Sequence, residues 1–109
     1  MLPIPESSFK LPEQSVVIEF FYGKDELDDL HALDIELMEL IEKKGVGVYD
    51  FHEINMDGTD GRLFMYGDNA EILFKAVWEK LKTVDFMQGA VATLQFGPET
   101  NAKSIEIEI

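Results

Sequence analysis

Two tetrapeptides decide the fold of this chain: FFYG at residues 20–23 and FMYG at residues 64–67. Each is followed by a stretch with helical spacing of apolar residues, and then by a second short apolar run, GVGV at 45–48 and GAVA at 89–92. The two copies are 44 residues apart, and the glycines of both motifs keep this offset. A strand–helix–strand pattern that occurs twice predicts a duplicated half-domain, in which both helices cover one face of a shared sheet.

The apolar spacing supports this order of elements. Positions 27, 30, 33, 37, 40 and 41 are leucine or isoleucine and form a helical stripe, which ends at a glycine suited to a helix C-terminus. The second helix carries a matching stripe and begins with Asp68, which resembles an N-cap residue. We expect helices at 24–44 and from about residue 69 to 82, and strands at 16–22, 46–56, 62–66, 90–96 and 103–109.

This order predicts an α+β fold, a ferredoxin-like two-layer sandwich (βαββαβ) with an antiparallel sheet. An extra C-terminal strand follows, because Ile105, Ile107 and Ile109 alternate with two glutamates. Residues 1–14 hold three of the four prolines and are expected to form an N-terminal arm, with 15–109 as a single domain. Such a sandwich leaves one face of the sheet open. Because the repeat is regular, Tyr22 and Tyr66 should have equivalent surroundings.

Charge restricts the choice of partner. The chain has 22 acidic and 9 basic residues, a net charge of −13, and no cysteine. Such a field repels phosphate backbones and anionic lipids, so we expect neither nucleic acid nor membrane as a partner. A basic protein is electrostatically favoured. The absence of cysteine and of any visible signal peptide fits a cytoplasmic protein.

One polar cluster could carry chemistry. If Met56 pairs with Arg62 across the hairpin, His52 faces Tyr66, and Asp50 lies two residues away on the same strand face. A histidine, a carboxylate and a phenol can perform general acid–base catalysis. A hydrogen-bonded polar group at the end of a sheet is the alternative reading of Asp50, His52 and Tyr66, and it is the one we favour.

Metal and cofactor signals are lacking. The turn at 57–61 holds two aspartates but not the further oxygen ligands of a calcium loop. His31 and Asp34 are three residues apart on the first helix, where a solvated pair is the simpler interpretation. Nucleotide and phosphate motifs are absent from the sequence, so we expect no cofactor and no metal.

Two surfaces could bind a partner. The first helix carries acidic residues on its non-stripe positions, among them Asp28, Asp29 and Glu36. On the sheet, if Phe64 and Tyr66 face the helices, the open face carries Val17, Glu19, Phe21, Tyr49, Phe51, Leu63, Met65, Thr93 and Gln95. We expect a homodimer or a basic partner on this face or along the strand at 105–109; coverage by the chain's own N-terminal arm is the alternative.

Two segments resemble short, uncharacterised bacterial proteins of similar length: DGTDGRLFMYG at 57–67, and FMQGA at 86–90 leading to the Gly-Pro pair at 97–98. The resemblance implies the same fold and transfers no activity.

We therefore expect an acidic protein-binding module without catalysis, such as an inhibitor or immunity-type partner of a basic protein. Two alternatives remain open at this point. One is a small ligand-binding regulator or enzyme with a pocket near His52, and the other is a dimer with a structural role.

Overall fold

The structure is a computed structural model that describes residues 14–57, 59–98 and 102–109. Residues 1–13 lie outside the described part, and with them nearly all of the expected N-terminal arm. In chain order the elements are β1 (Gln14–Phe21), α1 (Asp28–Lys44), β2 (Val48–Ile54), β3 (Asp60–Gly67), α2 (Ala70–Lys82), the short 3-10 helix η2 (Asp85–Met87), β4 (Val91–Gln95) and β5 (Ser104–Glu108).

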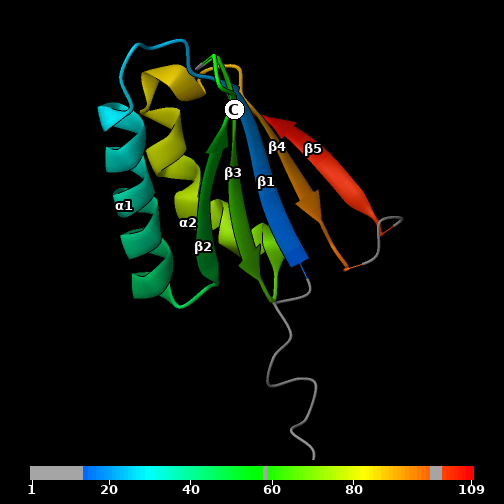
Figure 1. Cartoon of the computed structure of the whole chain (residues 1–109). Helices are drawn as coiled ribbons and strands as arrows, with labels where there is room; N and C mark the ends of the chain where they lie inside the picture. Colours follow the sequence, from blue (N-terminus) through cyan, green and yellow to red (C-terminus); the bar gives the residue numbers. More distant parts are fainter. Residues whose placement is uncertain (1–13, 58, 99–101) are drawn as a thin grey trace, which may run out of the picture.

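The strands form one sheet in the order β2-β3-β1-β4-β5, and every neighbouring pair is antiparallel. Both helices lie on the same face of this sheet, and β5 lies at the edge farthest from α1 (Figure 1). The predicted fold class is confirmed: an α+β two-layer sandwich of the ferredoxin-like type with an extra C-terminal strand.

The core lies between the sheet and the helices. Both predicted helical stripes are buried, apart from two positions: Leu27 is the exposed N-cap residue of α1 and Leu40 is only partly buried. Gly45 ends α1 in the left-handed conformation, at φ +63°, as the sequence predicts. The strands add buried side chains at every second position, namely Val16, Ile18 and Phe20 in β1, Leu63 and Met65 in β3, and Ala92 and Leu94 in β4.

The predicted orientation of β3 is wrong by one residue. Leu63 and Met65 face the helices, while Phe64 and Tyr66 lie on the open face, paired with Val17 and Ser15 of β1. The opposite orientation would turn Asp60 and Arg62 toward the core, and burying unpaired charges costs several kcal/mol. The charges at the start of β3 therefore set its orientation.

The repeat consequently holds for the topology and for the helices, but not for the side chains of the strands. Tyr22 is buried on the helix side, where its hydroxyl accepts a hydrogen bond from the backbone N–H of Leu30. Tyr66 is half-buried on the opposite face. The expectation that these two tyrosines have equivalent surroundings is wrong.

The start of α2 also differs from the prediction. Asn69, not Asp68, is the N-cap residue, and its side chain accepts a hydrogen bond of 3.1 Å from the backbone N–H of Ile72. Gln14 of β1 satisfies another free donor of this first turn, because its side-chain oxygen accepts from Ala70 N at 2.7 Å.

A pair of substitutions distinguishes the two cap residues. Asn69→Ala removes the capping oxygen and should lower the free energy of unfolding by about 1 kcal/mol. Asp68→Ala leaves this bond intact and should change it by less than about 0.5 kcal/mol. Urea denaturation of both variants measures the difference; equal losses would contradict the assignment of Asn69 as the cap.

Candidate functional site

The predicted grouping of Asp50, His52 and Tyr66 does not occur. A β-bulge interrupts the pairing of β2 with β3 between Tyr49 and Phe51. On the hairpin side of the bulge, His52 pairs with Leu63 and faces the helices. On the other side of the bulge, Tyr66 pairs with Val48 on the open face. Asp50 lies within the bulge and is exposed. The hairpin register assumed from the sequence is wrong already next to the turn, because Ile54 pairs with Gly61 and not with Phe64.

His52 instead belongs to a buried cluster with Asp34 of α1. Asp34 is only 3% exposed and is the buried charged residue of the described chain. One oxygen of its carboxylate accepts a hydrogen bond from the Tyr49 hydroxyl at 2.5 Å, and the other lies 2.6 Å from Nδ1 of His52. An ionised carboxylate can only accept, so Nδ1 carries the hydrogen. The cluster ties the middle of α1 to β2.

The surroundings of His52 leave little room for a substrate. Its side chain is 7% exposed. The ring of Phe51 stacks on it at a centroid distance of 4.4 Å, and the ring of His31 lies 5.7 Å away. Within the described residues, no group of three or more histidine, aspartate or glutamate side chains is arranged to hold a metal ion. The Asp34–His52–Tyr49 cluster joins α1 to β2 through two buried hydrogen bonds.

The buried position of Tyr49 changes its acidity. Burial raises the pKa of the Tyr49 hydroxyl above its usual value of 10.0, and the hydrogen bond to the Asp34 carboxylate raises it further. Tyr49 and Met65 were expected on the open face, and the structure corrects both placements: each side chain is buried under the helices. The bulge in β2 and the orientation of β3 are the reasons.

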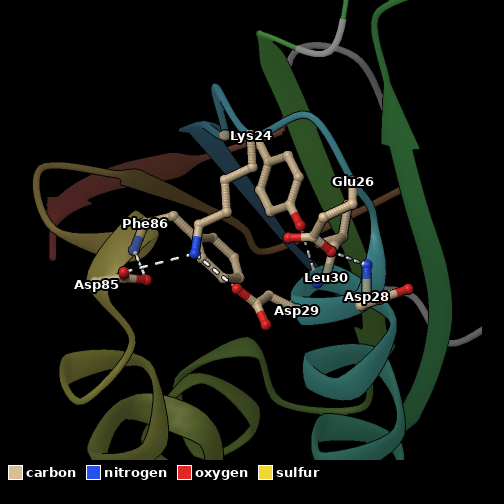
Figure 2. Close-up of polar contacts among 8 residues, drawn as sticks. Lys24, Glu26, Asp28, Asp29, Leu30, Asp85 and Phe86 are labelled. Carbon is tan, nitrogen blue, oxygen red and sulfur yellow. Dashed lines mark hydrogen bonds and ion pairs between the residues drawn. The ribbon is translucent and has the colours of Figure 1, made fainter.

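The acidic residues predicted on the first helix lie at two places. Asp28 and Asp29 form its first turn, where Lys24 binds the Asp29 carboxylate at 2.7 Å and reaches Asp85 of η2 at 3.6 Å (Figure 2). The bond to Asp29 raises the pKa of Lys24. Glu36, farther along α1, forms an ion pair with Lys80 of α2. Asp29 and Glu36 are thus partly neutralised by neighbouring lysines.

The open sheet face carries the remaining predicted residues. Phe21 is 66% exposed and Phe51 is 49% exposed, and Val48, at the other end of β2 from the hairpin turn, is also exposed. Neither helix lies on this side of the sheet (Figure 1). A hollow of about 410 Å³ opens there, lined by Phe21 and by charged side chains of three neighbouring strands, which are Glu19, Glu53, Asp60 and Arg62.

The chain matches no protein-family model, no curated protein and no solved structure. No family is therefore identified for the chain, and of what the expected resemblance implied, only the βαββαβ-like order of the elements is shown. Among the described residues, no helix has the length and apolar character needed to cross a bilayer.

Sequence reasoning missed Asp34 as a buried residue, although the spacing contains the signal. Asp34 lies four residues after Leu30 and three before Leu37, so it occupies a position of the buried stripe rather than of the solvated face. An acid at such a position needs a donor on the facing strand.

Replacing Asp34 tests the structural role of the cluster. Asp34→Ala leaves the Tyr49 hydroxyl and His52 Nδ1 buried without their acceptor, and should lower the free energy of unfolding by about 3 kcal/mol. Asp34→Asn keeps one acceptor and should cost less. Glu39→Ala on the exposed side of α1 is the control and should stay within about 0.5 kcal/mol. Losses of similar size for Asp34→Ala and Glu39→Ala in chemical denaturation would contradict the assignment.

The raised pKa of Tyr49 predicts a loss of stability in alkali. The folded state favours the neutral hydroxyl, so its contribution is fully present below the usual pKa of 10.0 and is lost as the pH rises above that value. Each such group adds a slope of about 1.4 kcal/mol per pH unit. Tyr49→Phe should be less stable near neutrality but lose stability more slowly above pH ~10. Equal alkaline slopes for the two proteins, measured by denaturation at a series of pH values, would contradict this.

Proposed function

We propose that this protein is an acidic binding module without catalysis, which acts as an inhibitor or immunity-type partner of a basic protein. The observation that carries the proposal is the combination of exposed aromatic side chains and an acidic hollow on one helix-free sheet face. Phe21 and Phe51 offer apolar contact area at an interface. Exposed apolar groups of this kind, surrounded by polar residues, commonly mark interaction sites.

The charges that line the hollow favour a cationic partner. Glu19, Glu53 and Asp60 line the hollow together with Arg62. Within the five described strands, Arg62 is the one lysine or arginine. A lysine or arginine of the partner can lie between the carboxylates and against the ring of Phe21, an arrangement that combines charge attraction with a cation–π contact.

Long-range charge adds to this arrangement. With a net charge of −13, the chain attracts a basic protein from a distance and accelerates its association at low ionic strength. Asp28 and the other exposed acids of α1 contribute to this field, although α1 lies on the opposite side of the sheet from the open face. We assign to α1 a role in steering and to the open face the direct contact.

The alternatives have less support. A regulator or enzyme acting through His52 requires a ligand to reach a side chain that is 7% exposed and already bonded to Asp34. A homodimer through the open face would bring together the acidic hollows of two molecules, each of net charge −13.

Matched alanine variants test the proposal. A basic protein that copurifies from the source cells is prepared separately, and its affinity is measured by calorimetry. Phe51→Ala should weaken binding about tenfold or more, since truncating a central aromatic residue commonly costs over 1 kcal/mol. Ile72→Ala, a residue of similar exposure on α2 (52% against 49%), should change the affinity by less than about twofold.

Salt provides a second readout: raising it should slow association. The proposal fails if both variants bind alike, or if association does not respond to salt.

A further inference from the structure

Among the described residues, no strand pairs with the outer edge of the sheet at β5. Phe96 N donates to the carbonyl of Lys103 at 2.9 Å, and Ile109 N donates to the carbonyl of Ala90 at 2.8 Å. These bonds direct the backbone groups of the odd-numbered residues toward β4. Because backbone groups alternate along an antiparallel strand, the N–H and C=O groups of Ser104, Glu106 and Glu108 point away from the sheet.

The side of β5 that faces the helix layer is also uncovered. Within the described residues, α2 contacts β1, β3 and β4, and neither helix packs against β5. Ile105 is consequently 41% exposed, while Ile107 and Ile109 are partly buried against the core. A further strand beside β5 would cover Ile105 and extend the apolar layer.

The opposite edge of the sheet is not equivalent. β2 is interrupted by the bulge between Tyr49 and Phe51, and α1 packs against it. A bulge disturbs the regular row of donors and acceptors that an added strand requires. β5, in contrast, pairs with β4 over its whole length without a register shift. Of the two edges, β5 is the one suited to accept a strand.

Charge selects the occupant of this edge. Glu106 and Glu108 pair with Thr93 and Val91 and therefore project on the open face of the sheet. In an antiparallel pair of two β5 strands, the glutamates of one copy would lie opposite those of the other, and like charges across strands are destabilising. A strand with lysine or arginine at every second position would instead pair its cations with Glu106 and Glu108.

We propose that β5 accepts an extended, basic segment of the partner protein as a sixth, antiparallel strand. The segment alternates cations, which lie beside Glu106 and Glu108 on the open face, with apolar residues, which lie beside Ile105 and Ile107 on the other. Backbone hydrogen bonds supply affinity and the alternating side chains supply specificity, as in other cases of strand addition. This inference rests on the proposed function for the basic character of the partner, and it adds the mode of binding.

A peptide with the sequence Lys-Val-Lys-Val-Lys-Val-Lys, blocked at both ends, is the probe. In an antiparallel pair, the residues opposite Glu106 and Glu108 direct their own backbone groups toward β5, so the lysine N–H groups make the bonds. N-methylation at the inner lysines should weaken binding about tenfold or more. N-methylation at the valines blocks only the far edge of the peptide and should leave binding within about threefold of the parent.

Two variants of Glu106 test the same bonds from the protein side. Glu106→Pro removes the carboxylate and the outward N–H, while Glu106→Ala removes the carboxylate alone. Proline is tolerated on edge strands, where its missing N–H faces away from the ladder. The peptide should bind Glu106→Pro about tenfold more weakly than Glu106→Ala, as measured by NMR titration.

Strand addition is overturned if the two N-methylated peptides bind the wild-type protein equally, and this comparison does not depend on the folding of any variant. It is also overturned if the wild-type protein sediments as a dimer that Glu106→Pro dissociates, since a second copy then occupies the edge. If Phe51→Ala weakens binding of the full partner while Glu106→Pro and Glu106→Ala bind it equally, strand addition fails and the proposed function stands.

Discussion

The β-bulge in β2 is the constraint on which both the buried cluster and the exposure of Phe51 on the open face depend. Side chains of a regular strand alternate between faces, so Tyr49 and His52, three positions apart, would lie on opposite sides of the sheet. The extra residue at the bulge brings both to the helix side, within hydrogen-bonding distance of Asp34. At the bulge, Phe51 adopts a positive φ of 107°, a conformation that costs about 1–3 kcal/mol in a residue other than glycine. The two bonds to the Asp34 carboxylate offset that strain.

A carboxylate buried between a helix and an edge strand is not needed for cohesion, since an apolar side chain of similar size would also fill the space. The carboxylate instead determines how β2 is positioned against α1. A leucine at position 34 would pack against β2 in several registers, whereas the carboxylate accepts its hydrogen bonds only where Tyr49 and His52 both reach it. We interpret the cluster as the feature that fixes the bulged register of β2. It thereby determines which side chains of β2 lie on the open face of the sheet.

Helices, strands and their order could be predicted from the sequence because apolar spacing and the glycines at the element ends report on local structure. The orientation of the strands could not be transferred from one half of the repeat to the other. In β3 the informative residues were Asp60 and Arg62, whose charges exclude one orientation, and not the resemblance of FMYG to FFYG. The bulge in β2 has no comparable signal, since no glycine occurs in that strand. The assumed register of the hairpin, which was already wrong next to its turn, placed Tyr66 opposite His52 in the predicted cluster and hid the role of Asp34.

The open face and the β5 edge form one continuous surface, and this continuity favours a basic partner over a second copy. Glu106 and Glu108 belong to both, because their side chains project on the open face while their backbone groups point outward from the edge. A partner that adds a strand to β5 is thereby placed beside the same face that carries Phe21, Phe51 and the acidic hollow. Self-association through either region would instead oppose carboxylates to carboxylates, and the net charge of −13 on each molecule would add to the repulsion. The charges that would oppose self-association are thus the same charges on which the proposed association with a cationic protein rests.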